Sequence, residues 1–317
     1  MTSDSDRSGI LLIDKPEGMT SFSVVSRVRR ILGVKKAGHA GTLDPFATGL
    51  LTIATGKATR VLRYMENDEK TYLAVMVLGK KTCTGDPEGE PVGGRMPDET
   101  ELSVLRKDSY GKIRETVQSM IGKIVQVPSS YSAIKINGRP AYDYARKGQE
   151  VEIPSRTVTV FSIDILRIWE DPEIRVEMRV HCSKGTYIRT LCEDIGERLG
   201  FGAYCASLRR LSCGSCSIDE ACTLEEIEKK VMEGDFSFIR GEVTAMQSMP
   251  KMEVTLSEAS DLRNGKKLDF SAFKDRMGNI DDSEQRVLAV CGDQMIAVVY
   301  REVSDGGVLL REERVFA

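Results

Sequence analysis

The sequence contains only two histidines, His39 and His181, among 317 residues. This scarcity excludes a histidine-rich metal site. Long hydrophobic runs are also missing, since no window approaches the roughly 18 consecutive apolar residues that a membrane helix needs, and we expect no membrane partner. Residues 1–8 are polar and lack the apolar segment of a secretory signal. They predict a disordered tail in a cytoplasmic protein.

Cysteines are too sparse for a disulfide scaffold, with eight spread through the chain. A reducing cytoplasm would keep these thiols free. A four-thiolate zinc site built from Cys205, Cys213, Cys216 and Cys222 is an alternative. That set contains a single CxxC pair at irregular spacing, however, and zinc sites favour regular pairs. We therefore expect buried apolar roles for these cysteines and no bound metal.

Cofactor motifs are absent as well. Gly56-Lys57 resembles the end of a phosphate-binding loop, but Leu51 stands where that loop requires glycine, and Ala58 replaces the hydroxyl residue that binds magnesium. No HExxH motif and no Ser-His-Asp arrangement is visible. Reactions that depend on a nucleotide cofactor or a metal are therefore not expected.

What the chain does contain is the composition of a soluble globular protein, with 41% hydrophobic and 29% charged residues. Its length suits one large domain with a smaller one. The net charge of −3 is unevenly distributed. One stretch carries eight basic residues and a single acid, Asp44; the basic residues are Arg27, Arg29, Arg30, Lys35, Lys36, Lys57, Arg60 and Arg63. Such a stretch is more often a solvated face than a nucleic-acid site, but a lone acid within it is unusual.

Asp44 lies in an irregular loop. Gly38, Gly41, Pro45 and Gly49 surround it, and the residue before a proline is biased away from helix. Most aspartates in such loops form turns or helix caps. Spacing within the loop does not by itself separate that structural role from a catalytic one.

Apolar periodicity outlines the N-terminal elements. Residues 10–13 predict a strand that ends at the proline just beyond it. Apolar residues at helical spacing over 24–32 predict a helix, capped by Thr20 or Ser21 and ended by Gly33.

The middle of the chain alternates between strand and helix patterns. The near-continuous apolar run 71–78 predicts a strand covered on both faces, followed by a Gly- and Pro-rich acidic connection over 79–97. Strict alternation over 175–182 predicts a half-buried strand. The period then changes to that of a helix over 188–199, which places Arg189 at a helix start just past a turn.

The C-terminal part, from about Pro250, has the pattern of a small β-rich module. Residues 287–291 and 295–300 flank a Gly-Asp turn and predict a hairpin, and a further strand begins near Val308.

Several sequence blocks together resemble the TruB family of bacterial tRNA pseudouridine synthases. The blocks occur in the family's order and spacing from residue 10 to about Leu211, and they comprise residues 38–45 (GHAGTLDP), 70–72 (KTY), 131–135 (YSAIK), 182–191 (CSKGTYIRTL) and 208–210 (LRR). The C-terminal module resembles the family's small PUA-like domain only weakly, with Arg263-Asn-Gly265 as its best local cue.

The resemblance implies an α+β fold. A mixed, largely antiparallel sheet flanked by helices would form the catalytic domain over residues 9–247. A small β-rich PUA-like RNA-binding domain would follow over residues 250–317. The protein is expected to act as a monomer.

The resemblance also implies a reaction. The family converts a uridine in the T loop of tRNA, position 55, to pseudouridine, by detaching the base at N1 and rejoining it to the sugar through C5. This isomerisation needs no cofactor and no metal, which agrees with the missing motifs. The base must be flipped out of the folded loop, which costs a few kcal/mol.

Roles for individual residues follow from the same resemblance. Asp44 would be the nucleophile and Arg189 the cation that keeps it ionised in a buried site. Tyr72 would pack on the target base and take part in proton transfer. The expected substrate-binding residues are His39, which fills space in the T loop, Tyr187 and Leu208, which line the base pocket, Lys15, and Arg60, which holds phosphate.

One alternative stays open at this stage. A non-catalytic tRNA binder, or an RNA-folding chaperone on the same scaffold, would also extrude and re-form the T loop. Tritium release from C5-labelled uridine separates these hypotheses, because only turnover removes the C5 hydrogen.

Overall fold

The computed structural model describes residues 7–65, 68–132, 134–136, 138–145, 147–149, 151–246, 249–273, 286–304 and 307–316. Most of the expected tail, residues 1–6, lies outside this part of the chain. Arg7 and Ser8 lie within it and contact the first domain. Arg7 Nη1 donates to the carbonyl of Leu32 at 2.5 Å, and the Ser8 hydroxyl donates to the carbonyl of Thr55 at 3.1 Å.

A large mixed sheet forms the centre of the molecule. Its main path runs in the order β1 (Gly9–Lys15), β3 (Thr48–Thr55), β12 (Ala203–Cys213), β4 (Lys70–Leu78), β11 (Ile174–Cys182), β10 (Arg156–Glu170) and β7 (Gly122–Gln126), while β2 (Ala37–Ala40) pairs with β3 and β13 (Cys216–Ser217) with β12. Among these described strands, only β12 and β3 pair in parallel. The predicted α+β class with a largely antiparallel sheet is confirmed.

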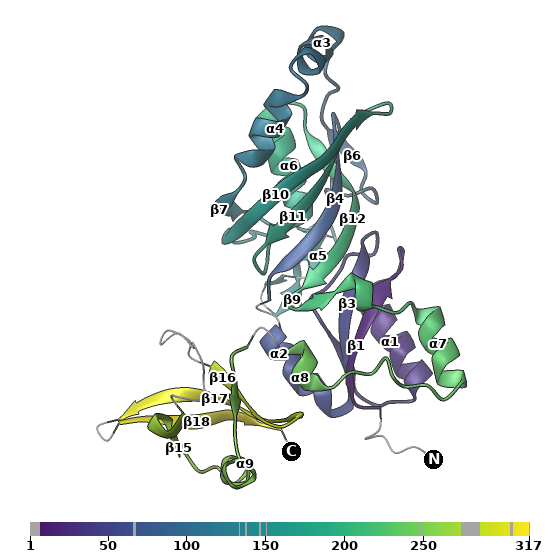
Figure 1. Cartoon of the computed structure of the whole chain (residues 1–317). Helices are drawn as coiled ribbons and strands as arrows, with labels where there is room; N and C mark the ends of the chain where they lie inside the picture. The colour runs from purple at the N-terminus through teal and green to yellow at the C-terminus, as the bar shows by residue number, and fades with distance from the viewer. Residues whose placement is uncertain are drawn as a thin grey trace.

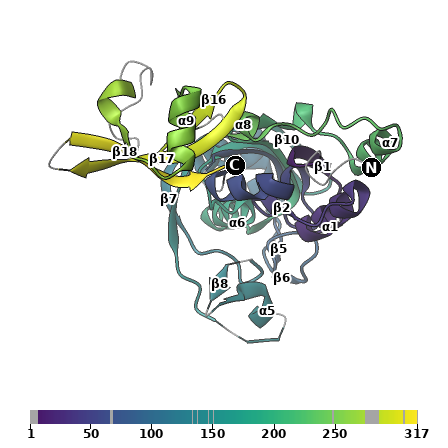
Figure 2. The same cartoon turned by 90° about the horizontal axis from the view of Figure 1, so that it is seen from below.

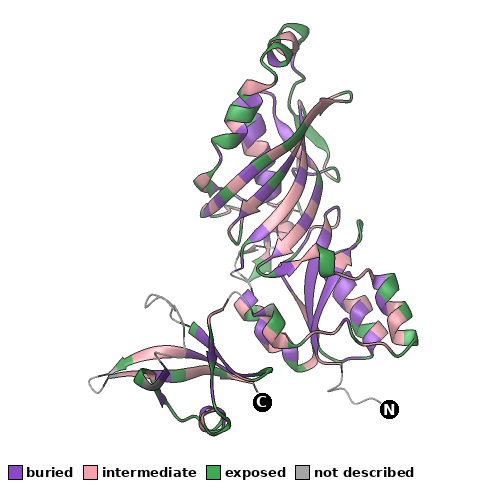
Figure 3. Ribbon diagram, viewed as in Figure 1, coloured by how far each residue is buried: buried purple, intermediate pink, exposed green. Residues whose placement is uncertain are grey.

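Helices cover the sheet at two places (Figure 1). Helices α4 (Gly111–Gln118) and α6 (Ile188–Leu199) pack on one face of β4, β10, β11 and β12, and their apolar residues form one core with those strands. Helices α1 (Ser21–Leu32) and α7 (Leu224–Met232) pack at the β1 and β3 end, where a second core forms. Figure 3 shows bands of buried, half-buried and exposed residues that alternate along strands such as β10 and β11.

Short elements complete the first domain. They are η1 (Gly56–Val61), α2 (Leu62–Met65), β5 (Lys81–Thr82), β6 (Pro91–Gly93), α3 (Glu99–Lys107), β8 (Lys135–Ile136), β9 (Arg139–Pro140), α5 (Ala141–Ala145), η2 (Ile218–Glu220) and α8 (Glu242–Ala245). The predicted connection over 79–97 therefore contains the small β5–β6 hairpin. Within the described residues, no helix is long and apolar enough to cross a membrane.

Local signals placed the helices well. The Thr20 hydroxyl accepts a hydrogen bond from the backbone of Ser23 at 3.0 Å and caps α1, while Gly33 ends that helix with φ of 66°. Helix α6 likewise spans 188–199, and Gly200 ends it in the left-handed conformation. Both predicted helices are confirmed.

The burial predicted for β4 is only partly correct. Its last residues, Met76–Leu78, are fully buried, but Tyr72 and Leu73 are half-buried. Tyr72 lines a cleft, described below, and Leu73 lies on the sheet face away from α4 and α6. A continuous apolar run therefore overstated how much of the strand is covered.

A five-stranded C-terminal sheet lies beside the first domain (Figures 1 and 2). Its order is β14 (Lys251–Glu253), β16 (Arg286–Cys291), β17 (Gln294–Ser304), β18 (Gly307–Val315) and β15 (Leu268–Asp269), accompanied by α9 (Leu256–Arg263) and η3 (Phe270–Phe273). The predicted hairpin and following strand are confirmed. Leu288 and Val298 of this sheet share an apolar cluster with Leu50 and Met65 of the first domain, so the two parts are packed together.

Candidate active site

A cleft of about 490 Å³ opens in the first domain beside Asp44. Its walls come from four stretches that are distant in sequence. These are residues 41–44, the start of β4, the turn that leads into α6, and the end of β12, with residues from 132–135 at the rim. Asp44, Tyr72, Tyr187, Arg189 and Leu208 all line it. The structure thus gathers five of the eight predicted site residues in one place.

Three side chains from different elements hold the loop that carries Asp44. Buried Arg210 donates from Nη2 to the carbonyl of Gly41 at 3.0 Å. The Ser21 hydroxyl, at the start of α1, donates to the Leu43 carbonyl at 3.0 Å and accepts from its amide at 2.9 Å. Lys15 Nζ donates to the carbonyl of Pro45 at 3.1 Å. An irregular loop without ladder hydrogen bonds is thereby fixed on both sides of Asp44.

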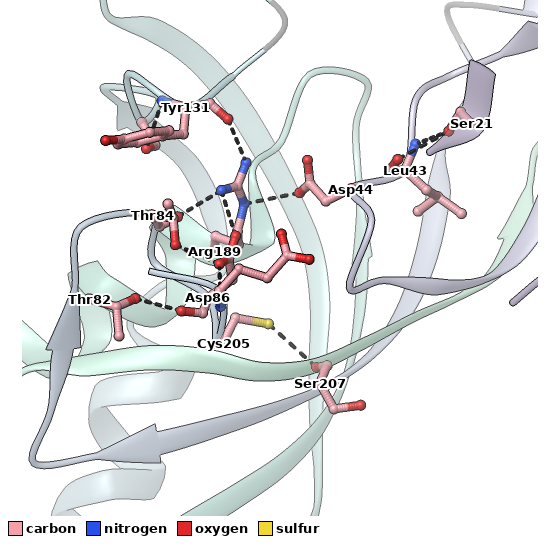
Figure 4. A network of polar contacts seen from close by, with 12 residues as sticks. Ser21, Leu43, Asp44, Thr82, Thr84, Asp86, Tyr131, Arg189, Cys205 and Ser207 are labelled. Atoms are coloured by element: carbon pink, nitrogen blue, oxygen red, sulfur yellow. Dashed lines mark hydrogen bonds and ion pairs between the residues drawn. The ribbon is translucent and has the colours of Figure 1, made fainter. Parts of the chain in front are cut away.

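Arg189 connects the Asp44 loop with the segment between β5 and β6, which carries Thr84 and Asp86 (Figure 4). Its Nε lies 3.0 Å from Oδ2 of Asp44, and its Nη1 lies 2.9 Å from Oδ2 of Asp86. The guanidinium also donates to the carbonyls of Thr84 at 2.7 Å and Tyr131 at 3.2 Å. With 4% of its side chain exposed, Arg189 is held in a single position by four partners. The predicted contact with Asp44 is present.

Asp86 is a second carboxylate that the sequence analysis did not identify. It is buried, and its Oδ1 accepts hydrogen bonds from the Thr84 hydroxyl at 2.5 Å and from the amide of Glu88 at 3.0 Å. These contacts fix the carboxylate that in turn fixes Arg189. Its place between Gly85 and Pro87 is a turn signal, but nothing local indicates that Arg189, 103 residues away, is its partner.

The charges around Asp44 oppose one another. Burial raises the pKa of Asp44, and the positive charge of Arg189 lowers it again; Asp86 raises it and Lys15 lowers it by smaller amounts. The net result is a pKa above the ordinary value. Arg189 thus limits, without cancelling, the cost of keeping this carboxylate ionised in the cleft.

The cleft therefore combines a fixed carboxylate with a buried guanidinium, two tyrosines and no other acidic residue among its described lining. Sequence comparison gives this arrangement its context. The model of the TruB family pseudouridylate synthase N-terminal domain matches residues 29–188, and that of the tRNA pseudouridylate synthase B C-terminal domain matches residues 189–249. The chain belongs to the TruB family of tRNA pseudouridine synthases.

Full-length relatives support this assignment to the TruB family. The tRNA pseudouridine synthase B of Streptococcus pneumoniae serotype 2 is 38% identical over 312 residues, 98% of this chain and 100% of the relative. That of Corynebacterium diphtheriae is 40% identical over 284 residues, 89% of this chain and 92% of the relative. The protein is therefore an enzyme that isomerises uridine to pseudouridine in tRNA, as the sequence blocks predicted.

Solved structures agree on the fold. A chain from a structure described as an H/ACA ribonucleoprotein bound to a substrate RNA containing 2′-deoxyuridine superimposes with a TM-score of 0.72 and 25% identity, covering 98% of this chain and 86% of that one. A chain from an archaeal box H/ACA complex gives a TM-score of 0.71 and 26% identity over 98% and 86% of the two chains. The pseudouridine synthase fold is confirmed.

Two further residues of this TruB-family site position Tyr187. The Gln126 side chain accepts a hydrogen bond from the Tyr187 amide at 3.0 Å and donates to its carbonyl at 3.2 Å. The guanidinium of Arg156 lies 5.5 Å from the centre of the Tyr187 ring. Sequence reasoning missed both residues, because they lie on β7 and β10 and meet Tyr187 only in the folded sheet.

Lys15 lies beneath the cleft rather than on its surface. Its side chain is fully buried, and Nζ donates to the carbonyls of Pro16, Met19 and Pro45 at 2.9, 2.6 and 3.1 Å. Burial lowers its pKa to about 8, partly offset by the charge of Asp44. The contact expected between Lys15 and substrate stays a prediction; the contact present here is with the Asp44 loop.

His39 and Arg60 also lie outside the lining of the Asp44 cleft. His39 is on β2, opposite Ile53 of β3, and its Nδ1 is buried without a hydrogen-bond partner in the described structure. Burial lowers its pKa. Arg60 borders a separate cavity of about 700 Å³, whose charged lining is entirely basic and consists of Lys35, Lys36, Lys57, Arg60 and Arg314.

Possible metal ligands do not gather in the described part of the chain: no three His, Cys, Asp or Glu residues are grouped to hold an ion. All eight cysteines lie among the described residues and carry free thiols. Cys205, Cys213 and Cys216 are buried, and Cys222 is half-buried.

Proposed function

We propose that the protein modifies the uridine at position 55, in the T loop of tRNA, through a covalent adduct with Asp44. The observation that carries the proposal is the fixed Asp44 carboxylate, 3.0 Å from the buried guanidinium of Arg189, at the wall of a cleft. A carboxylate held ionised beside an open site is suited to act as a nucleophile.

The reaction divides into steps that these residues can serve. Asp44 bonds to the nucleotide as the N1–C1′ bond breaks, the base turns within the cleft, and C5 bonds to C1′ as Asp44 departs. Tyr72 and Leu208 border the space that the base would occupy. A cavity of this size lies within the range of small-ligand sites, so one flipped nucleotide is the expected occupant.

The basic cavity beside Arg60 supports binding of the rest of the T arm. Its five basic side chains come from both domains, since Arg314 lies on β18 and the others lie between residues 35 and 60. Phosphate oxygens are the natural partners of such a surface. We assign residues 9–247 to catalysis and 250–317 to additional tRNA contacts.

The proposed location and assembly follow from the substrate. Mature bacterial tRNA is found in the cytoplasm, where we expect the enzyme to act. We also expect the enzyme to act as a monomer. No metal or cofactor is needed for the isomerisation.

The deciding experiment follows tritium release from tRNA labelled at C5 of uridine. Wild-type protein should release one tritium per tRNA, and a transcript with cytidine at position 55 should release none. Asp44→Asn should bind tRNA normally but lose at least about 1000-fold in single-turnover rate, equivalent to ~4 kcal/mol of barrier. Asp164→Asn, on β10 away from the cleft lining, is the matched control.

Two results would contradict the proposal. Release from the position-55 cytidine transcript would place the target uridine elsewhere. A rate for Asp44→Asn within about tenfold of wild type would remove Asp44 as the nucleophile.

A further inference from the structure

Arg210 is among the largest fully buried side chains of the protein, with 1% of the residue exposed. It lies on β12, between β3, which follows the Asp44 loop, and β4, which carries Tyr72. Its Cα is paired with that of Gly49 on β3 and with that of Tyr72 on β4. A Cβ at Gly49 would lie 2.4 Å from the backbone oxygen of Arg210, so only glycine permits this close approach.

The partners of Arg210 are neutral. Nε donates to the carbonyl of Leu50 at 2.7 Å, and Nη2 donates to that of Gly41 at 3.0 Å. Within the described part of the chain, Arg210 has no carboxylate at ion-pair distance. The adjacent Arg209, in contrast, forms a bidentate ion pair with Asp14, with N–O distances of 2.7 and 2.9 Å.

A buried cation without an anion is costly, because desolvation is not repaid by an opposite charge. Arg210 is therefore a fixed positive charge available to any anion that forms in the cleft it lines. The only described anionic group of that lining, Asp44, is paired instead with Arg189.

One group of the cleft lining that can become an anion is the hydroxyl of Tyr72, on the strand paired with that of Arg210. Tyr72 and Arg210 are paired across β4 and β12 and line the same cleft. Burial raises the pKa of Tyr72 to about 12, while the positive charge of Arg210 opposes that rise. The thiols of Cys182 on β11 and Cys213 on β12 also act on Tyr72 and raise its pKa. Burial raises the pKa values of both thiols, which therefore remain neutral at pH 7.

We propose that Arg210 is a positioning residue of the isomerisation, which holds the Tyr72 hydroxyl and stabilises its phenolate while that hydroxyl carries a proton between two atoms of the base. The inference rests on the proposed function. It extends that function by assigning a partner to the proton-transfer residue.

The proton balance of the reaction requires such a carrier. When N1–C1′ breaks, N1 keeps the bonding electron pair and needs a proton; once C5 has bonded to C1′, C5 carries a proton that must leave. Tyr72 donates its hydroxyl proton to N1 and, as phenolate, accepts the proton from C5. Asp44 gains and then loses its bond to the nucleotide, and no oxidant or reductant is consumed.

The test is a double-mutant comparison of Arg210→Gln, Tyr72→Phe and the combined variant. Single-turnover tritium release, tRNA affinity and thermal unfolding are measured for each. Arg210→Gln should lower the rate by about 100-fold, within the usual contribution of acid–base catalysis, without weakening tRNA affinity more than about threefold. In the Tyr72→Phe background the same change should cost less than about threefold.

Two companion variants separate charge from structure. Arg210→Lys keeps the charge and should recover at least about tenfold of the rate lost in Arg210→Gln. Arg209→Gln removes the neighbouring, ion-paired arginine and should leave the rate unchanged. If Arg210→Gln does not fold, the comparison with and without Tyr72 is made with Arg210→Lys.

An equal loss with and without the Tyr72 hydroxyl would overturn the inference, because Arg210 would then act only by holding the Gly41 carbonyl. So would an Arg210→Lys rate no higher than that of Arg210→Gln. Either result leaves wild-type tritium release at position 55 intact. Failure of the proposed function is recognised separately, by the absence of that release.

Discussion

Replacing Arg189 by lysine tests whether the cleft needs a guanidinium or only a positive charge. Arg189 contacts Asp44 through Nε and Asp86 through Nη1, and it reaches the Tyr131 carbonyl through Nη2. Lysine carries all its N–H donors on one nitrogen. That nitrogen cannot occupy the three positions that the guanidinium fills.

The size of the effect follows from these contacts. Arg189→Lys loses at least one charge-assisted hydrogen bond, worth roughly 1.5–3 kcal/mol. If the lost bond is the one to Asp44, the nucleophile is no longer oriented and the whole loss raises the barrier. The single-turnover rate should then fall by roughly 10- to 150-fold. Loss of the bond to Asp86 instead leaves the buried carboxylate of Asp86 without its compensating positive charge, which destabilises the fold.

The assay is single-turnover tritium release at saturating protein, with thermal unfolding measured in parallel. Arg198→Lys is the matched control, since Arg198 lies on the same helix, away from the cleft lining, and its Nη1 donates to the exposed hydroxyl of Ser119. The control should match wild type in both measurements. A rate for Arg189→Lys within about threefold of wild type would refute the argument that the planar guanidinium of Arg189 orients Asp44.

Four further predictions follow from the same contacts. Ionised Asp44 is the active form, so activity should be lost as pH falls through its raised pKa. Because Asp86 raises the pKa of Asp44, Asp86→Asn should move the acid side of the pH–activity profile to lower pH. An unchanged profile would contradict this influence of Asp86 on Asp44. Arg60→Gln should weaken tRNA binding and reduce the slope of log affinity against log salt concentration by about one. Arg114→Gln, at an exposed position of α4, should change neither. Chelator treatment should leave activity unchanged, and elemental analysis that finds one zinc per chain would contradict this. A chain ending at Met249 should bind tRNA more weakly yet keep a saturated single-turnover rate within about threefold of wild type; a collapse of that rate in a folded protein would show that the C-terminal sheet helps to build the cleft.

Local sequence patterns were sufficient to predict the strands and helices that carry the site residues. The alternation in β11, the cap at Thr20 and the change of period before α6 are all properties of neighbouring residues. They correctly placed Arg189 at the first turn of α6. The lone acid in a basic stretch made Asp44 unusual, but its expected role as nucleophile came from the family resemblance.

Local patterns could not supply the partners of the buried charges. Asp86 meets Arg189 across 103 residues of sequence, and Arg210 meets Gly41 across 169. Each contact depends on strand order and on which face of the sheet a side chain occupies, and periodicity does not encode those features. For the same reason, the family resemblance named Lys15 as a site residue, while its three carbonyl contacts could not be foreseen.

The acidic composition of the chain does not conflict with a polyanionic substrate once the charges are placed. The chain carries a net charge of −3, but the Asp44 cleft is lined by one acid against five basic side chains, Lys70, Lys135, Arg156, Arg189 and Arg210. The second cavity has five basic residues and no acid in its described lining. Phosphate affinity depends on the potential at the binding surface, and at about 0.15 M salt the field of charges more than about 8 Å away is largely screened. Acidic residues farther away than this therefore leave both basic cavities attractive to phosphate.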